Sequence, residues 1–469
     1  MTIKKTTGRP FSPRRVGATI ALSAALLSVG CQSASERLLQ VTDPDVINPS
    51  DVVSAAAAVA VANGTIATFR SITGGPNANG SESTWLFGGL LVDEWSTAST
   101  FVQNDETDQR QIKLDNATVT TGLRNLYRTR TRANESVAAL LLKQPTLRSL
   151  IAEMYLARGF AEMQLALDFC NGIPISDGNA TPPVNGPPLT NKQVFTLAAA
   201  SLDTAIQYAN GTDAQSVLMN RSAKVVRARV ALSLNDFATA GTLVTGIPTA
   251  FAYQHTYSAT TNSSAIWGQA FSGRRYSVGD SIEGNKRDIL VANAIPFSSA
   301  KDPRLPVVIP TSGSINGQDG LTYARTTIMW GQFTPLDVVN GIDARMVEAE
   351  VALKAGNVTQ WLAIHNALRA APPKLGDVQP AAMPPLVDPG TTDGRVSLHF
   401  REKAFWTFSR GQRLGDMRRL ITQYGRTEAN TYPQGIHYKG GSYGKDVNLP
   451  IVSDEMNNAL FKGCTDRLP

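Results

Sequence analysis

Cys31 is the residue whose chemistry is easiest to infer, because it follows an apolar stretch near the start of the chain. The stretch covers residues 16–29 and comes after five basic residues: Lys4, Lys5, Arg9, Arg14 and Arg15. A basic segment, an apolar segment and a small residue before a cysteine form the layout of a lipoprotein signal, whose thiol becomes diacylated. The stretch is shorter than the roughly 20 residues that span a bilayer. We therefore predict a cleaved leader at 1–30 and a lipidated Cys31, the alternative being an ordinary leader that happens to contain a cysteine.

The charge of the chain does not favour a polyanionic partner. The sequence holds 44 basic and 38 acidic residues and has a pI near 9.2. Five of the 44 basic residues and none of the acidic ones lie in the predicted leader, which leaves 39 basic against 38 acidic residues. The mature surface is nearly neutral, so we expect no nucleic acid as a partner.

Residue patterns typical of metal or covalent catalysis are missing from the sequence. The four histidines lie far apart, without i, i+4 spacing: His255, His365, His399 and His437. Neither Cys-x-x-Cys nor G-x-x-x-x-G-K occurs. Asp93 and Glu94 are adjacent, and side chains at adjacent helical positions point about 100° apart, so the two cannot flank one glycosidic bond. We predict no metal, no cofactor and no catalytic residues.

Cys170 and Cys464 remain after Cys31 is set aside. An exported chain matures in an oxidising compartment, where two such cysteines can form a disulfide. The alternative is a pair of buried thiols that pack as small apolar groups.

Helical periodicity accounts for most of the first half of the mature chain. After a polar tether at 31–49, we predict a helix over 49–72, with Asn48 as its cap, and another over 146–169. The strongest stripe begins at Val194, is capped by Thr190, and continues through Leu197, Ala198, Ser201, Leu202, Ala205 and Ile206. Small residues stand at the expected helix contacts: Ala157, Ala161, Ala205, Ala228 and Ala231. These features predict a degenerate tetratricopeptide-like stack of helix pairs.

The second half divides into an irregular and a helical part. Residues 247–335 lose the helical period and are rich in Ser, Thr, Asn, Gly and aromatic residues, which predicts loops with a few short strands. Helices are expected again over 336–355, 358–370 and 396–424, with a short one near Asp454. We predict one mainly α domain over 50–469, with a helical repeat part at 50–246, a loop-rich part at 247–335 and a C-terminal helical part at 336–469.

Several segments together resemble the SusD/RagB family of outer-membrane nutrient-binding lipoproteins. They are 153–167 with Gly172-Ile173-Pro174, Leu126-Tyr127 with Ala133-Asn134, Asp302-Pro303-Arg304, Ala344-Arg345 with Glu348, Glu350 and Gly356-Asn357, Asn366 with Arg369, and the block Arg401-Glu402, Phe405-Trp406, Gly411, Arg413, Asp416, Arg418-Arg419, Asn448, Pro450-Ile451 and Glu455. With Gly30-Cys31 they cover nearly the whole mature chain in the expected order. The departure at Cys170-Asn171 leaves the ligand open.

The resemblance implies a fold, a location and a partner. The fold is helical and tetratricopeptide-like. The protein is held on the outer membrane by its lipid and is exposed at the cell surface. The helical face docks on a SusC-like TonB-dependent β-barrel transporter, while loops on another face bind an oligosaccharide or another small nutrient. The other hypotheses are a helical-repeat scaffold of the envelope and a lipid-anchored hydrolase.

Aromatic residues are the candidates for binding a sugar, because a flat apolar ring packs against the C–H face of a pyranose. Those outside the best-defined repeats are Trp85, Trp95, Trp267, Tyr276 and Trp330. Trp267 and Tyr276 are favoured because they stand in the irregular region beside Arg274 and Arg275. For each ring, the alternative is a place in the core.

The charged residues near the C-terminus have a structural explanation. Arg401, Glu402, Arg413, Asp416, Arg418 and Arg419 are close together in the sequence. An active site would need such groups, but an ion-pair network that ties the last helix to the body requires fewer assumptions.

Overall fold

The computed structural model describes residues 52–75, 82–180, 182–284, 288–309 and 316–469. The predicted leader, Cys31 and the tether lie outside these residues. In the part of the chain that is described, no helix combines the length and the apolarity needed to cross a membrane.

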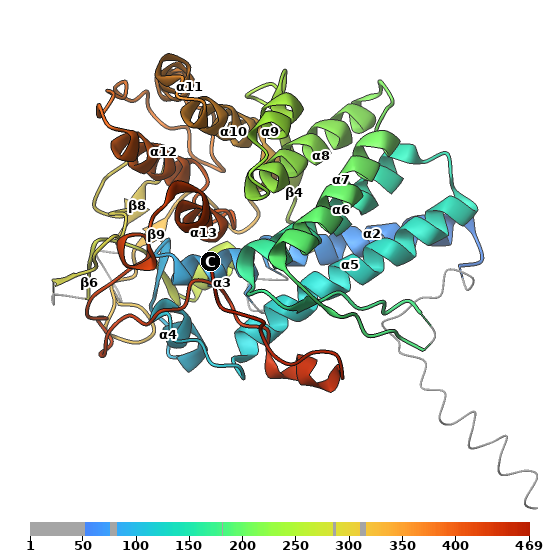
Figure 1. The fold of residues 1–469 in the computed structure, drawn as a ribbon, viewed down its shortest axis with the longest axis horizontal. Coiled ribbons are helices and arrows are strands. Elements are labelled where there is room, and N and C mark those ends of the chain that lie inside the picture. Colours follow the sequence, from blue (N-terminus) through green and yellow to red (C-terminus); the bar gives the residue numbers. More distant parts are fainter. Residues whose placement is uncertain (1–51, 76–81, 181, 285–287, 310–315) are drawn as a thin grey trace, which may run out of the picture. The chain divides into compact units, whose positions relative to one another are not determined.

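Eight helices form a stack of four pairs (Figure 1). The pairs are α2 (Ala55–Ser71) with α5 (Ala117–Lys143), α6 (Arg148–Asp168) with α7 (Asn191–Tyr208), α8 (Ala214–Ser233) with α9 (Phe237–Val244), and α10 (Gly341–Lys354) with α11 (Val358–Ala370). Neighbouring pairs also touch, through α5 and α6, α7 and α8, and α9 and α10. The predicted mainly α, tetratricopeptide-like stack is therefore confirmed.

Small residues allow the helices of the stack to approach closely. Ala157, Ala161, Ala205, Ala228 and Ala231 are all fully buried, as their positions predict. Gly159 on α6 faces Leu202 on α7 so closely that a Cβ at this position would collide with the leucine side chain. The contact between α6 and α7 thus requires a glycine.

Two predicted helix starts are wrong, and side-chain caps explain both. Helix α2 begins at Ala55 instead of 49, because the hydroxyl of Ser54 accepts a hydrogen bond from the N–H of Ala57 at 3.1 Å. The predicted cap Asn48 lies outside the described residues. Residues 336–340 form strand β10 (Leu336–Asn340), paired antiparallel with β4 (Ala252–His255), and α10 starts only after Asn340 completes a capping box with Asp343.

The predicted helix over 396–424 is two helices, α12 (Thr392–Trp406) and α13 (Arg413–Tyr424). Between them Ser409 and Gly411 have φ angles of 54° and 63°, which no helix allows. Gly411 also lies against the ring of Trp85, where a Cβ would overlap the indole. Close packing on Trp85 therefore breaks the helical period.

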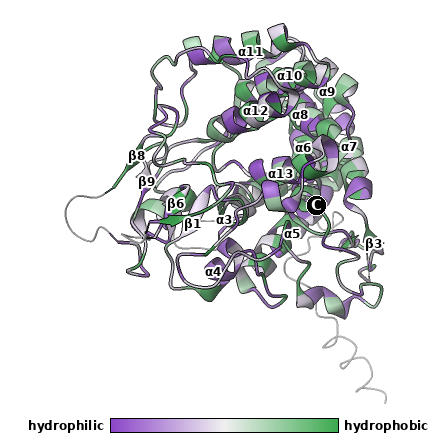
Figure 2. Cartoon of the chain, turned by 60° about the vertical axis from the view of Figure 1, so that its left-hand side comes forward, coloured by the Kyte–Doolittle hydropathy of each residue, from purple (hydrophilic) through white to green (hydrophobic). Residues whose placement is uncertain are grey.

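Short elements connect or flank the long helices, and α3, α4, β1, β6, β8 and β9 lie together on one side of the stack (Figures 1 and 2). The short elements are α3 (Thr84–Leu91), α4 (Val102–Asp108), the strand pairs β1 (Trp95–Thr97) with β5 (Tyr276–Val278), β2 (Ile173–Pro174) with β3 (Pro188–Leu189), β6 (Ile282–Glu283) with β7 (Ile289–Leu290), and β8 (Val307–Val308) with β9 (Thr326–Thr327), the π-helix η2 (Trp267–Ser272), and the 3-10 turns η3 (Glu428–Asn430) and η4 (Ser453–Asn457).

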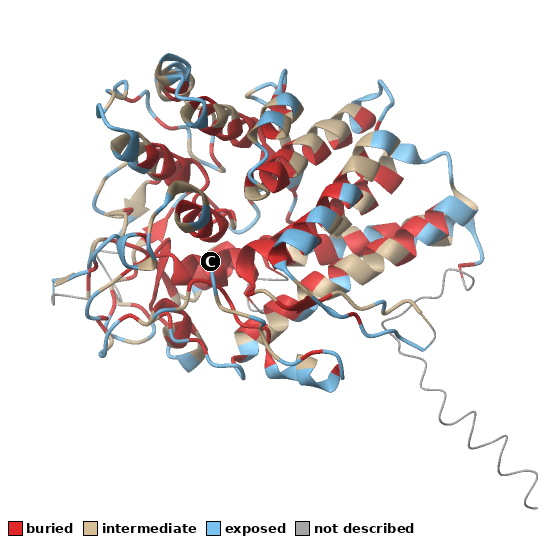
Figure 3. Cartoon of the chain, in the orientation of Figure 1, coloured by how far each residue is buried: buried red, intermediate tan, exposed pale blue. Residues whose placement is uncertain are grey.

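Figure 3 shows that buried residues follow the helix faces that meet, whereas exposed residues collect on the connections.

Cys170 and Cys464 are joined by a disulfide across 294 positions of the sequence, with their Cα atoms 5.9 Å apart. The bond holds the C-terminal tail beside the end of α6. Of the two alternatives open from the sequence, the structure contains the disulfide.

Buried ion pairs hold α12 and α13 to the stack. The carboxylate of Glu350 on α10 accepts hydrogen bonds from Arg419 on α13 and, at 2.8 Å, from the Tyr424 hydroxyl. Arg419 also reaches Asp416 at 3.2 Å, and Asp416 pairs with Lys403 of α12 at 2.7 Å. The fully buried Glu350 thus links three helices.

A second group of pairs connects α12 to a loop and to α11. Arg304 donates to Glu402 at 2.7 Å and to Asp302 at 2.6 Å, and Arg369 donates to Glu402 at 2.9 Å. The predicted network is confirmed for Glu402, Asp416 and Arg419. Its other three members do something else: Arg413 and Arg418 donate to main-chain carbonyls, and Arg401 stacks on Phe405.

We expect Glu350→Ala to lower the free energy of unfolding by about 3–5 kcal/mol, because it leaves the buried guanidinium of Arg419 without its main counter-charge. The urea midpoint measures this loss. The control is Asp388→Ala, which breaks a solvent-screened pair with Arg395 and should leave the urea midpoint almost unchanged. Equal losses in the two variants would contradict a special role for Glu350.

Candidate functional site

The π-helix η2 presents two aromatic rings on the loop-rich part of the molecule. Trp267 and Phe271 stack with their ring centroids 6.1 Å apart and their planes 20° from parallel. Phe271 is 53% exposed. Trp267 is half-buried, whereas the other five tryptophans of the chain are buried. The pair therefore offers the most accessible extended aromatic surface on this segment.

The backbone of η2 explains why the two rings stand side by side. The N–H of Gly273 donates to the carbonyl of Gly268 at 2.7 Å, a bond between residues five apart. The inner residues Gly268, Gln269 and Ala270 are buried and fix the turn against the body. A wide helical turn of this kind places residues four apart on the same side, and such turns often occur at functional sites.

A third aromatic residue, Phe101, lies near η2 because β1 and β5 pair. The N–H of Ala98 donates to the carbonyl of Arg275 at 2.8 Å, which continues the ladder of Trp95–Thr97 beyond Tyr276. The Arg275 guanidinium carbon lies 3.9 Å from the centre of the Phe101 ring, a cation–π contact. Phe101 is 45% exposed and Arg275 is half-buried. Arg275, which follows Phe271 after three residues, is thus in contact with the Phe101 ring.

A third segment, residues 318–323, is hydrogen-bonded to the residues that follow η2. The N–H of Gln318 donates to the carbonyl of Arg274 at 3.3 Å, and the hydroxyl of Ser277 donates to the carbonyl of Tyr323 at 2.7 Å. Arg274 has a φ of 51°, an unusual conformation for a residue with a side chain. We name the surface formed by Phe101, Trp267, Phe271 and Arg275 the aromatic surface.

Four of the predicted binding rings are wrong, because the structure buries them. Trp95 and Tyr276 meet edge to face at 6.2 Å across the β1–β5 pair, and Trp95 and Trp330 both pack on Phe408. Trp85 packs on Phe160 in the helical core. A ring with no free face cannot stack on a sugar. Trp85, Trp95, Tyr276 and Trp330 are therefore core residues, while Trp267 and Arg275 remain predicted binding residues.

Phe101 and Phe271 are the aromatic residues that sequence patterns do not single out for binding. The spacing of Trp267 and Phe271 is a signal, since residues four apart lie on one side of a helical turn. No helical pattern surrounds them, however, and no local feature links Phe101 to residues 170 positions later. Only the pairing of β1 with β5 brings these segments together.

A group of buried carboxyls lies beneath β1 and β5. Burial, with help from Glu283 and Asp108, holds the pKa of Asp93 well above its usual range. Burial raises the pKa of Glu94 to about 8, and burial together with the charge of Asp108 raises the pKa of Glu283 to about 8. Among the described residues no cluster of three or more His, Cys, Asp or Glu is arranged to hold a metal ion. With pKa values of about 8, Glu94 and Glu283 hold their protons over part of the neutral pH range.

The fold is similar to those of SusD-like proteins in solved structures. The surface glycan-binding protein A of Bacteroides uniformis superimposes with a TM-score of 0.62 at 14% identity, over 87% of this chain and 99% of that one. A laminarin-binding SusD-like protein has a TM-score of 0.60 at 15% identity over 88% and 99%. A SusD-like protein of Bacteroides fragilis has a TM-score of 0.60 at 12% identity over 88% and 97%. No protein-family model and no curated protein matches the sequence. The resemblance in fold to SusD-like proteins is confirmed.

The buried carboxyls predict how stability depends on pH. A carboxyl with a pKa near 8 when folded and near 4.5 when unfolded holds its proton only in the folded state between these values, so stability falls as pH rises. Histidines such as His255, whose pKa burial lowers to about 3, contribute only below pH of about 6.5. We expect Glu94→Gln to flatten the decline between about pH 6.5 and 8 by up to roughly 1.4 kcal/mol per pH unit.

Chemical denaturation across this pH range measures the slope. Asp388→Asn is the control, because its partner Arg395 lowers the pKa of Asp388, which therefore titrates far below the range tested. A slope in Glu94→Gln equal to that of the unmodified protein would contradict the assignment.

Proposed function

We propose that the protein is a cell-surface lipoprotein that binds a glycan on the aromatic surface and delivers it to a SusC-like TonB-dependent transporter of the outer membrane. The observation that carries the proposal is the stacked pair of half-buried Trp267 and exposed Phe271 on the loops of a SusD-like fold. Two solved proteins with this fold are a surface glycan-binding protein and a laminarin-binding protein.

The chemistry of the aromatic surface suits a sugar chain. Exposed rings are costly to leave in water, at roughly 25 cal/mol per Å² of apolar surface, so a ligand that covers them gains this energy. The C–H groups of a pyranose present a flat apolar face of matching size. The guanidinium of Arg275, half-buried over Phe101, is a hydrogen-bond donor for hydroxyl groups at the edge of the same surface.

The location on the membrane rests on Cys31 and on the resemblance of fold. Acylation of the thiol would anchor the chain without a spanning helix. We place the lipid at the outer membrane and the aromatic surface on the outside of the cell, where polysaccharides are met. The helical stack is then available for the transporter.

We expect the double substitution Trp267→Ala with Phe271→Ala to weaken binding of the preferred polysaccharide by about tenfold or more, because two stacking contacts are lost. Affinity electrophoresis of the full chain in gels that contain laminarin or other polysaccharides measures retardation. Leu142→Ala is the matched control, since this α5 side chain is 60% exposed and lies on a different element.

Three outcomes would contradict the proposal. If no polysaccharide retards the protein, an envelope scaffold is favoured. If the double variant is retarded as strongly as the unmodified protein, the aromatic surface is not the binding site. If reducing ends are released, a hydrolase is favoured. The urea midpoints of both variants should stay within about 1 kcal/mol of the unmodified protein, so that a loss of binding is not a loss of fold.

Cys31→Ser tests the anchor. We expect the variant to lose metabolic labelling by palmitate and to move from the membrane fraction to the soluble fraction of the envelope, because the serine hydroxyl does not accept the diacylglyceryl group. Cys464→Ser serves as the control, since it removes a cysteine but leaves Cys31. Palmitate labelling that persists in Cys31→Ser would show that the lipid is attached elsewhere.

A further inference from the structure

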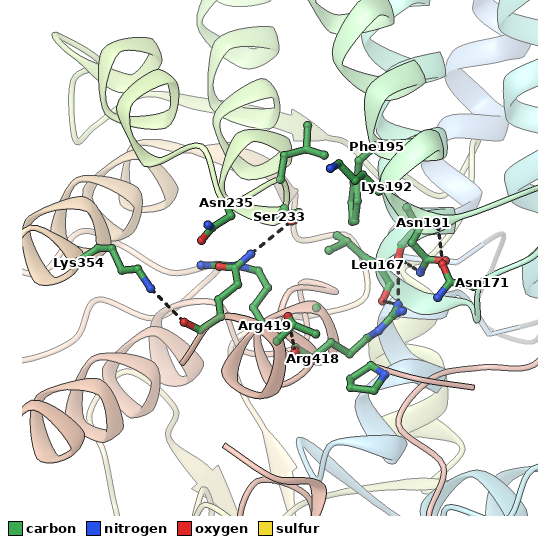
Figure 4. A pocket seen from close by; sticks show the side chains of 16 residues that line it. Leu167, Asn171, Asn191, Lys192, Phe195, Ser233, Asn235, Lys354, Arg418 and Arg419 are labelled. Atoms are coloured by element: carbon green, nitrogen blue, oxygen red, sulfur yellow. Dashed lines mark hydrogen bonds between the residues drawn. The ribbon is translucent and has the colours of Figure 1, made fainter. Parts of the chain in front are cut away.

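A pocket of about 540 Å³ lies within the helical part of the molecule, on elements that the aromatic surface does not use (Figure 4). It is formed by the end of α6, the first turns of α7, the turn after α8, the end of α10 and one face of α13. A volume of this size is typical of sites for small molecules.

The charged side chains that line the pocket are all cationic, and Pro469 at the end of the chain lines it as well. The cationic residues are Lys192, Lys354, Arg418 and Arg419, and no aspartate or glutamate lines the pocket. Figure 4 shows these side chains around one space, with Lys192 on α7, Lys354 on α10, and Arg418 and Arg419 both on α13. Bringing these positive charges together is unfavourable unless water or an anion compensates them.

Arg419 is compensated by the protein itself. It pairs with Glu350 and, at 3.2 Å, with Asp416, and its Nε donates to the side chain of Gln423 at 3.2 Å. This guanidinium belongs to the ion network that holds α13. It forms one wall of the pocket and is not available as a ligand-binding charge.

Lys354 and Lys192 make no ion pair with any residue that the structure describes. The ammonium of Lys354 donates to the carbonyl of Gln423 at 3.0 Å and lies 4.5 Å from the centre of the Tyr424 ring. Lys192 is exposed in the first turn of α7, where the helix dipole already contributes positive charge. A cation at that position gains nothing from the helix dipole, so an anion that comes close would be favoured.

Arg418 is buried, at 6% exposure, and forms no ion pair within 4 Å among the described residues, although the charges of Asp168 and Asp466 act on it from farther away. Its Nη1 donates to the carbonyls of Ala166, Leu167 and Phe169 at 2.9, 2.6 and 3.1 Å, which are neutral acceptors at the end of α6. Its Nε has no hydrogen-bond partner. Leaving a buried donor of a charged group without a hydrogen bond is costly.

The rest of the lining would suit the uncharged part of a small molecule. Amide and hydroxyl groups come from Asn191, Asn235 and Thr422, and the Oδ1 of Asn191 is buried without a partner. Leu167 and Phe195 supply apolar wall. The combination fits a polar molecule with one anionic group and several hydroxyls.

We propose that this pocket binds a small anion, such as a sugar bearing a carboxylate or a phosphate group, through Lys192, Lys354 and Arg418. The site is independent of the aromatic surface and does not require the proposed glycan transport. Lys192 on α7 and Lys354 on α10 would contact the anion directly. Arg418 on α13 would add positive charge while its Nη1 continues to bind the carbonyls at the end of α6.

Isothermal titration of the full chain with galacturonate, galactose and inorganic phosphate tests this site. We expect galacturonate to bind at least about tenfold more tightly than galactose, and Lys192→Gln with Lys354→Gln to weaken it by about tenfold or more, because charge-assisted hydrogen bonds are lost. The control is Lys301→Gln with Lys374→Gln, which removes two exposed lysines with the same change in net charge. It should leave binding unchanged.

The remaining outcomes also decide the question. Phosphate binding that disappears in the Lys192 and Lys354 variant supports an anion site whose recognised group is phosphate. The proposal is overturned if neither anion binds, if galactose binds as tightly as galacturonate, or if the control variant loses binding equally. Because polysaccharide retardation on the aromatic surface is a separate measurement, failure here leaves the proposed function untouched.

Discussion

The burial of charge between the last two long helices and the helical stack is the constraint on which the rest of the structure depends. Glu350, Arg419 and Glu402 have almost no exposure, so each must find its partner or the fold loses several kcal/mol. Such pairs contribute little net stability compared with apolar packing, but they permit only one arrangement of the helices that carry them. The positions of α12 and α13 are therefore set by charge geometry as much as by shape.

Both candidate sites depend on that placement. The connection between α12 and α13 carries Phe408 beneath Trp95 and lets Ser409 accept from the Trp95 indole N–H at 3.0 Å, which supports the β1–β5 pair under the aromatic surface. On the other side, α13 brings Arg418 to the end of α6. One helix thus bridges the stack and the loops, and the loops can be irregular because their base is fixed.

The motifs that resemble the SusD/RagB family meet in space at this network. Arg304 of the Asp-Pro-Arg segment binds Glu402 of the C-terminal block, and Glu350 of the middle block binds Arg419. These segments lie far apart in the sequence, yet each supplies a charge that the next one needs. A charge pattern spread over the chain is thus a property of the fold and not of the ligand, which explains why it does not reveal what is bound.

Local physical chemistry was enough to predict the helical stack, the Thr190 cap and part of the ion-pair network of the last helices, since periodicity, capping and charge act over a few residues. Tertiary structure alone decided which rings are exposed, because Trp95 and Tyr276 turn inward only when β1 pairs with β5 across 180 positions. It also decided that 336–340 is a strand, that the last helix breaks at Gly411, and that Lys192, Lys354 and Arg418 surround one pocket. These features come from contacts between distant segments, which no local pattern encodes.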